Sequence, residues 1–250
     1  MRFLIQRING EVVHDFANEL LQAKKFVLWL DKEEMETDFC EGLNFDSVRN
    51  PGDCIPVGSV EFVSAFLRKY YPQAEEALRP LNVPDVLFPF AGRTIANVWW
   101  KEDYAPFKKE EYVFCKSLDT IKSSWNGMHE TRLCESKDFR HCQVSQLIDI
   151  ASEWRVIVFH NEPLYVGYYG GNPLAFPSPL TISEMIKTYS PEAPVAYTLD
   201  VARTAEGETV VIECHRFFSC GLYGFSDWSK LPYMFSQEWF EMKNTRSEIA

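Results

Sequence analysis

Hydrophobic residues in the first third of the chain recur with spacings that indicate both strands and helices. Alternating side chains at residues 2–7 predict an opening strand, and the apolar run at 25–30 (KFVLWL) predicts a buried one. Between them, residues 13–24 have helical spacing at Phe16, Leu20 and Leu21. This order of elements indicates a small α/β unit.

Another helix is predicted directly after the segment 55–59 (IPVGS). Ser59 precedes residues 60–71, and its hydroxyl is suited to accept the first hydrogen bond of a helix. Pro72 is expected to end this helix, because proline cannot continue the hydrogen-bond pattern.

Prolines separate this unit from the rest of the chain. The residue before a proline favours extended backbone, so Pro80, Pro84 and Pro89, followed by Gly92, predict a connector. We therefore expect an N-terminal α/β unit at residues 1–90 and a second region at 91–250.

Short strands dominate the second region. Helical spacing is expected at 183–189 and around 143–149 or just before it. Strands and helices do not alternate regularly, so the sequence predicts an α+β domain. The strands are predicted at residues 112–116, 154–159, 164–169, 195–201 and 209–214.

Composition and charge narrow the class of protein. The 250 residues include 46% hydrophobic side chains, enough for a folded core, and 25 basic against 36 acidic residues give a net charge of -11. Such an acidic surface repels phosphate backbones and anionic lipids, so we expect no general nucleic-acid binding and no membrane binding.

No apolar run approaches the ~20 residues of a membrane span. The N-terminus turns polar too early for a signal peptide, and the seven cysteines lack a CxxC motif. We expect reduced thiols and a cytoplasmic protein.

A predicted hairpin carries two acidic residues. If Glu206-Gly207 is a two-residue turn, Asp200 lies opposite Glu213, and strand alternation puts His215 on the same face as Glu213. Like charges at directly opposed positions are destabilising, so removing one of them is expected to stabilise a metal-free sheet. A divalent cation that bridges two carboxylates would remove the repulsion.

The alternative is that both acids face solvent on an exposed sheet. Asp200 lies within the apolar stretch 197–201, and Glu213 follows Val210-Val211-Ile212. Strands this apolar are unfavourable for solvated acids, so we favour the metal site.

Three cations are candidates for binding phosphate. Lys116 ends a predicted strand, Lys122 lies in the segment after it, and Arg155 lies at the start of the next long strand. Fixed cations directed at one point can stabilise a transferring phosphoryl group. Any one lysine is more often a solvated side chain, and the hypothesis rests on the set.

Together these residues resemble the ATP-grasp enzymes, and most closely the clade named for one arginine and two lysines. The resemblance is carried by Lys116 with its following loop, Glu153-Trp154-Arg155, Asp200 and Glu213-x-His215. The segment 55–63 (IPVGSVEFV) is similar to the N-terminal unit of those proteins.

The resemblance implies two α+β subdomains that clamp ATP after a small α/β unit. Lys116, Lys122 and Arg155 would contact phosphates, and Glu153 would hold the ribose. Adenine would be bound by the backbone of a hinge formed by Gln146, Leu147 and Ile148.

By the same resemblance, Asp200 and Glu213 would bind magnesium. Family members usually have asparagine at the position of His215. Magnesium prefers oxygen ligands, so His215 either supports the ligands, or the site accepts manganese, or the activity has changed.

The expected activity is an ATP- and magnesium-dependent carboxylate–amine ligase that forms an amide through an acyl phosphate and releases ADP and phosphate. The carboxylate and amine would be small molecules or peptides. A kinase with the same clamp, or a non-catalytic ATP-binding module, remains the alternative, and the sequence leaves the oligomeric state open.

Overall fold

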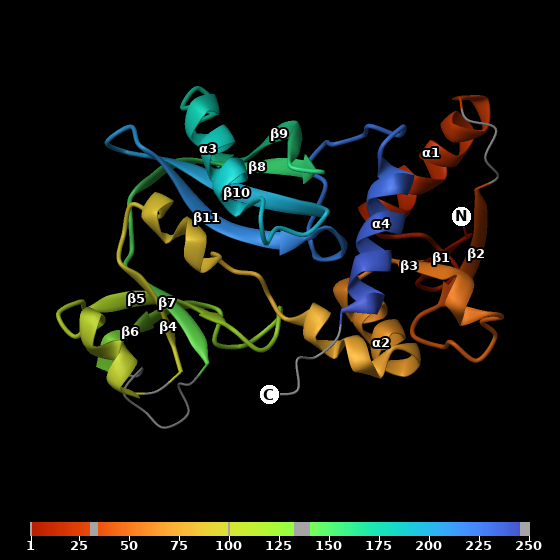
Figure 1. The fold of residues 1–250 in the computed structure, drawn as a ribbon, viewed down its shortest axis with the longest axis horizontal. Coiled ribbons are helices and arrows are strands. Elements are labelled where there is room, and N and C mark those ends of the chain that lie inside the picture. The colour runs from red at the N-terminus through yellow and green to blue at the C-terminus, as the bar shows by residue number, and fades with distance from the viewer. Residues whose placement is uncertain (1, 31–34, 100, 133–140, 246–250) are drawn as a thin grey trace. The chain divides into compact units, whose positions relative to one another are not determined.

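Three β-sheets organise the part of the chain that the computed structural model describes, which is residues 2–30, 35–99, 101–132 and 141–245 (Figure 1). The chain forms two compact units. The first comprises Met1–Leu78, Pro194–Tyr197 and Arg216–Ala250, and the second comprises Arg79–Ala193 and Thr198–His215.

The first unit contains a parallel sheet with strand order β2-β1-β3. The middle strand is fully apolar at its centre, where Phe3, Leu4 and Ile5 are buried. The predicted opening strand is therefore confirmed. The elements are β1 (Arg2–Arg7), β2 (Glu36–Glu41), β3 (Cys54–Val57), α1 (Asp15–Leu30), α2 (Val60–Tyr70), α4 (Leu231–Asn244) and the 3-10 helices η1 (Pro51–Asp53), η2 (Pro72–Leu78) and η6 (Phe217–Ser219).

Residues 25–30 are the end of helix α1, so the strand predicted there is wrong. A short, continuous apolar run has no periodicity that separates a buried strand from a buried helix. No glycine or proline lies within residues 15–30, so the helix that starts at Asp15 continues through the apolar run.

Helix α4 belongs to the first unit although it lies near the end of the chain. The ring of Phe235 on α4 packs 5.3 Å from Phe16 of α1, and Trp239 packs 5.7 Å from Phe66 of α2. These large aromatic surfaces are buried in one core.

The expected division at residue 90 differs from the two units in three places. Residues 79–90 lie in the second unit, 216–245 lie in the first, and so do 194–197. The aromatic packing of α4 is the reason for the second difference, and a pattern along the chain does not reveal it. As an assignment of domains, the division stays a prediction.

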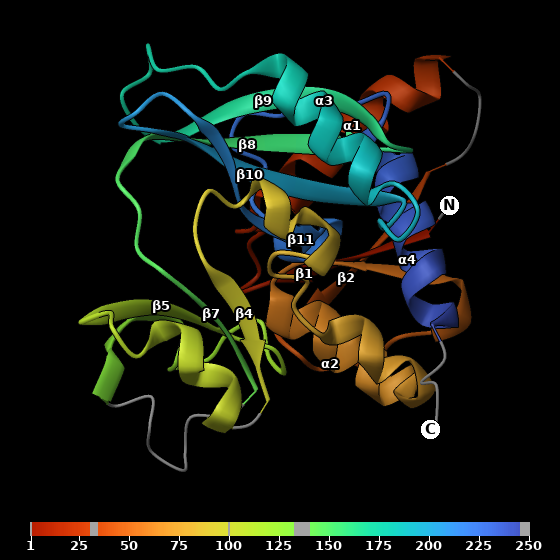
Figure 2. The ribbon, with the colours of Figure 1, turned by 60° about the vertical axis from the view of Figure 1, so that its left-hand side comes forward.

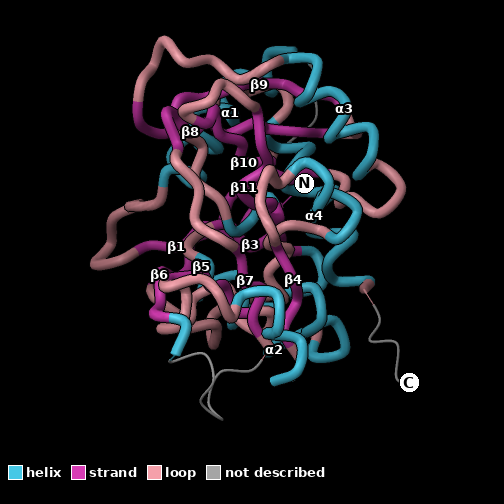
Figure 3. The backbone as a smooth tube through the Cα atoms, turned by 90° about the vertical axis from the view of Figure 1, so that its left-hand side faces the viewer, coloured by secondary structure: helices cyan, strands magenta, loops and turns pink. Residues whose placement is uncertain are grey.

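Two four-stranded sheets form the second unit. One has the order β4-β7-β5-β6 with antiparallel pairs, and the other has the order β11-β10-β8-β9. Helix α3 lies over the second sheet (Figures 1 and 2). The connections β8–β9 and β10–β11 are turns (Figure 3). The strands are β4 (Ile95–Val98), β5 (Tyr112–Ser117), β6 (Gly127–Glu130), β7 (Cys142–Ser145), β8 (Ile150–Phe159), β9 (Glu162–Gly171), β10 (Ala196–Thr204) and β11 (Thr209–Arg216), and the helices are α3 (Pro179–Tyr189), η3 (Asp85–Phe90) and η4 (Lys101–Phe107).

The predicted strands of this region and the helix at 183–189 are confirmed, and so is the α+β class. A helix at 143–149 is wrong, because residues 142–145 are strand β7. The alternative position just before it falls on residues 133–140, which lie outside the described residues. Gln143 and Ser145 are buried there despite their polarity. Gln143 satisfies its amide with the backbone of Val83. The strand has only 4 residues, and so short an alternation is easily taken for part of a longer helical spacing.

Two structural observations concern the expectations of no membrane span and of reduced thiols. No helix within the described residues is both long and apolar enough to cross a membrane. None of the six cysteines that the structure describes forms a disulfide, and all six are buried. Cys134 lies outside the described residues.

The start of α2 provides a test of the first unit. The Ser59 hydroxyl accepts a hydrogen bond from the Phe62 N–H at 3.2 Å. We expect Ser59→Ala to lower the free energy of unfolding by about 1 kcal/mol, because this N–H loses its partner. Urea denaturation measures the change. Ser59→Thr keeps the cap and should stay near wild type, and equal losses in both variants would contradict the capping role.

Candidate active site

Both sheets of the second unit line one pocket of about 300 Å³. Its wall is largely apolar and contains Ile95, Phe114, Leu147, Ile148, Ile150 and Ile212. Charged and polar groups converge on the same space, which is the usual composition of a ligand site. They are Arg93, Lys116, Gln143, Ser145, Gln146, Glu153 and Glu213.

The predicted hinge lies in the pocket wall. Gln146, Leu147 and Ile148 connect β7 to β8. The side chain of Gln146 fixes the segment by accepting from Thr94 N–H at 2.9 Å and donating to Glu110 at 2.7 Å. Within the described residues, the backbone groups of Leu147 and Ile148 form no hydrogen bond with other backbone groups. These groups are therefore available to a ligand.

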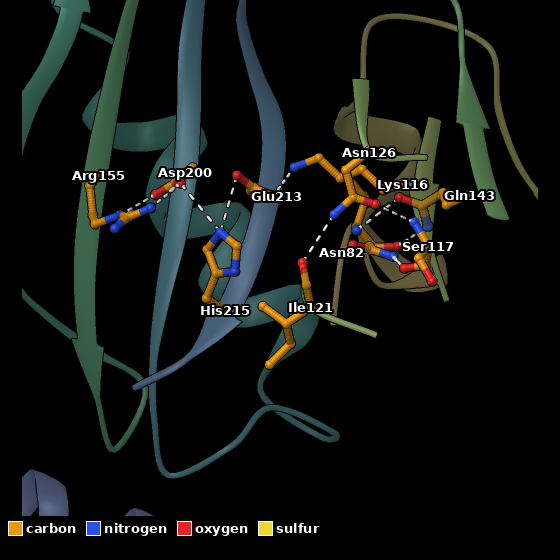
Figure 4. A network of polar contacts seen from close by, with 11 residues as sticks. Asn82, Lys116, Ser117, Ile121, Asn126, Gln143, Arg155, Asp200, Glu213 and His215 are labelled. Atoms are coloured by element: carbon orange, nitrogen blue, oxygen red, sulfur yellow. Dashed lines mark hydrogen bonds and ion pairs between the residues drawn. The ribbon is translucent and has the colours of Figure 1, made fainter. Parts of the chain in front are cut away.

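Asp200, Glu213 and His215 come together on the β10–β11 hairpin. One ligand atom from each lies within 4.8 Å of the others. The imidazole Nε2 is 3.1 Å from Glu213 Oε1 and 3.9 Å from Asp200 Oδ2 (Figure 4). Burial lowers the pKa of His215 to about 4, so the ring is neutral at pH 7. Two carboxylates and a neutral imidazole are a donor set suited to a divalent cation.

The turn of this hairpin differs from the prediction. Thr204 N–H donates to Glu208 C=O, and Thr204 C=O accepts from Gly207 N–H. The loop thus has three residues, 205–207, and the two-residue turn is wrong. Gly207 has φ 88°, a conformation that glycine adopts without strain, as three-residue hairpin loops require.

Cations of the chain already compensate the two acids. Arg155 donates from Nε and Nη2 to the two oxygens of Asp200 at 2.8 and 2.6 Å, with both side chains buried. Lys116 Nζ contacts Glu213. Asp200 is therefore one half of an ion pair, and the expected repulsion between two unpaired acids is wrong.

Burial also shifts the pKa values of the pocket's charged groups. It lowers the pKa of Lys116 to about 8, although the charges of Asp200 and Glu153 act in the opposite direction. The pKa of Glu153 is raised by burial and by the negative charge of Asp200. These shifts indicate a poorly hydrated site in which charges interact strongly.

The structure brings in one cation that sequence reasoning missed. Arg93 lines the pocket, and its Nη1 donates to the carbonyls of Ala91 and Val211, both at 2.9 Å. Burial lowers its pKa to about 10, and no carboxylate of the described chain pairs with it. Gly92 is the feature of the sequence that could have indicated the position of Arg93. It has φ 61°, and a Cβ there would lie 2.5 Å from a methyl group of Val210, so only glycine brings this segment so close to β11.

Lys122, which is predicted to bind phosphate, lies outside the pocket. It is exposed in the loop between β5 and β6 and is not part of the pocket lining. The other candidates lie in the pocket wall or, as Asp200, Arg155 and His215, in the ion-pair network that adjoins it.

Comparisons with known proteins agree with this architecture. Residues 90–230 match the sequence family described as ATP-grasp domain, R2K clade family 2. A comparison with curated proteins gave no match.

Among solved structures, the chain is similar to three enzymes that share its fold. A D-cycloserine synthetase, DcsG, has TM-score 0.56 and 12% identity, covering 96% of this chain and 100% of that one. D-alanine–D-alanine ligase from Bacillus anthracis has TM-score 0.56 and 12% identity, covering 97% and 98%. The macrocyclase MdnC from Microcystis aeruginosa MRC, bound with precursor peptide MdnA, has TM-score 0.57 and 10% identity, covering 95% and 99%.

The buried pair of Arg155 and Asp200 generates a stability test without nucleotide or metal. We expect Asp200→Asn to lower the free energy of unfolding by about 3–5 kcal/mol, because it leaves the buried guanidinium without its counter-charge. Urea denaturation measures the loss.

Two comparisons make this prediction specific. Glu213→Gln should cost less, because Glu213 and Lys116 keep 18% and 19% of their side chains exposed. The double variant Arg155→Met with Asp200→Leu should recover most of the stability, since both buried charges are gone. An Asp200→Asn protein as stable as wild type would show that the pair does not compensate buried charge.

Proposed function

The chain belongs to the ATP-grasp superfamily, in its R2K clade, and from this premise we propose that it is an ATP-dependent carboxylate–amine ligase. The observation that carries the proposal is the pocket itself. One space is bounded by apolar side chains, by a hinge with available backbone groups, and by converging cations and acids.

Each part of the pocket has a proposed role toward ATP. Leu147 and Ile148 would form hydrogen bonds with adenine through their backbone, and the apolar walls would cover its faces. Lys116 and Arg93 would contact phosphate oxygens, because both are half-buried cations that line the pocket. Glu153 would accept hydrogen bonds from the ribose hydroxyls.

Two further cations complete the proposed phosphate site. Arg155 has a planar guanidinium that can pair with a phosphate as it pairs with Asp200. Lys122 would approach from the exposed β5–β6 loop, and its role rests on the family resemblance alone.

The acidic cluster would hold the divalent cation. Asp200, Glu213 and His215 fit such an ion, because their ligand atoms are close together and the imidazole is neutral. When bound, magnesium or manganese would supply positive charge to the phosphates. The imidazole makes manganese acceptable beside magnesium, whose preferred ligands are oxygens.

The proposed reaction has two steps. A substrate carboxylate oxygen attacks the γ-phosphorus of ATP, the bond from this phosphorus to the bridging oxygen breaks, and ADP leaves. An amine then attacks the acyl phosphate carbonyl, and inorganic phosphate leaves as the amide forms. Lys116 and Arg155 would stabilise the charge on the transferring group, since fixed cations in a poorly hydrated site need little reorganisation.

The names of the structural relatives support both a small and a peptide substrate. D-alanine–D-alanine ligase acts on an amino acid, whereas MdnC was solved with a precursor peptide. For this chain we propose a carboxylate and an amine of either kind.

The products of turnover test the reaction. Amino acids, short peptides and protein tails are screened for ADP release with ATP and either Mg²⁺ or Mn²⁺. We expect ADP, phosphate and an amide in equal amounts, and a hydroxamate when hydroxylamine replaces the amine. AMP with pyrophosphate would contradict the mechanism. A phosphorylated product without free phosphate would identify a kinase, and ATP binding without turnover would identify a binding module.

The role of Arg93 is tested by binding alone. We expect Arg93→Gln to weaken ATP by about ten- to a hundredfold, because a charge-assisted phosphate contact contributes about 1.5–3 kcal/mol. Adenosine, which has no phosphate, should bind the variant as it binds wild type. Calorimetry measures both ligands, with Arg68→Gln in the first unit as a control for loss of an exposed arginine. A parallel loss of adenosine would mean that Arg93 only shapes the pocket.

A further inference from the structure

Asn82 connects the two sheets of the second unit. It lies in the segment between η2 and η3, is buried, and has φ 48°. Its backbone carbonyl accepts from Cys214 N–H of β11 at 2.6 Å. Its side-chain Nδ2 donates to the carbonyl of Ser117, the last residue of β5, at 2.8 Å. One buried residue therefore bonds to a strand of each sheet.

Both attachment points are next to residues of the candidate site. Ser117 follows Lys116, and Cys214 lies between Glu213 and His215. Lys116 and Glu213 are the side chains that meet across the pocket (Figure 4). Because the two bonds of Asn82 join the neighbouring peptides, they set how far apart Lys116 and Glu213 are held.

Neighbouring bonds make this connection rigid. Gln143 of β7 bonds to both the N–H and the carbonyl of Val83, at 3.0 and 2.8 Å. Gln143 is also the register partner of Lys116. Ser117 N–H donates to Asn126 Oδ1 at 2.8 Å. Several hydrogen bonds among neighbouring groups, most of them buried, restrict these residues to one arrangement.

The residue type suits the position. Asparagine adopts positive φ more readily than most residues, and its amide supplies the donor that Ser117 requires. Glycine would match the backbone but not the side-chain bond. Aspartate would have the same shape but would place a carboxylate beside a carbonyl.

We propose that Asn82 is a positioning residue, which holds β5 and β11 so that the phosphate-binding cations and the acidic cluster form one site. This inference rests on the proposed function. Asn82 acts through Lys116 and Glu213 and contacts neither nucleotide nor metal. Loss of Asn82 should weaken the binding of ATP together with its metal, because this complex would contact both sheets. Metal binding by the β10–β11 cluster alone should persist.

The first test needs no ATP. Lys116→Ala, Glu213→Ala and the double variant form a double-mutant cycle in the free energy of unfolding, measured with Asn82 intact and with Asn82→Gly. We expect coupling between Lys116 and Glu213 in the first set and loss of most of it in the second. Equal coupling in both sets would overturn the proposal.

The second test uses the intact protein with ATP and Mn²⁺. Asn82→Gly and Asn82→Asp should lower kcat about a hundredfold, the scale expected for a small misplacement of reacting groups. They should also reduce, about tenfold or more, the factor by which Mn²⁺ tightens ATP binding. Adenosine affinity and Mn²⁺ affinity without nucleotide should stay within twofold of wild type.

Asn161→Gly is the matched control. Asn161 has φ 61° and lies exposed in the turn between β8 and β9, so this variant makes the same backbone change away from the site. It should keep wild-type kcat and coupling. Parallel losses of adenosine, Mn²⁺ and ATP binding in Asn82→Gly would show a merely structural role and overturn the proposal. If wild type itself binds no ATP, the proposed function fails, and the cycle still decides whether Asn82 holds the two strands.

Discussion

The buried ion pair between Arg155 and Asp200 is the constraint on which the second unit depends. The two side chains lie on neighbouring strands of one sheet, make two short hydrogen bonds and are almost inaccessible to water. Each charge is tolerable in that place only because the other is present. The pair therefore fixes the alignment of β8 with β10, and Glu213 and His215 of β11 extend the polar cluster from it.

The ion pairs of Asp200 and Glu213 also affect how a nucleotide and its metal would bind. The acids proposed to bind the cation form ion pairs with Lys116 and Arg155. In the proposed function, binding exchanges partners, since phosphates would take the cations and the metal would take the acids. Arg93 is the exception, because no carboxylate of the described chain pairs with it. A half-buried cation without a counter-charge is incompletely hydrated, which makes it a favourable contact for an incoming anion.

Patterns along the chain located much of this site but misjudged its internal contacts. The predicted hinge segment 146–148, Lys116, Glu153 and Glu213 line one pocket, and Asp200 and His215 adjoin Glu213. Arg93 and Asn82 were missed for one reason: both lie in the proline-rich connector, where no periodicity marks a position as buried.

The sequence by itself determined the strands of the second unit, the α+β class and the residues that carry charge into the site, because alternation and residue chemistry are local properties. It did not determine that residues 25–30 are helical, since an apolar run is compatible with either structure until its neighbours are known. Only the tertiary structure decided that α4 packs in the first unit, that Gln143 and Ser145 are core residues, and that Arg155 pairs with Asp200. Each of these is a contact between residues far apart in the chain, where burial makes the partner, and not the local pattern, decide the energy.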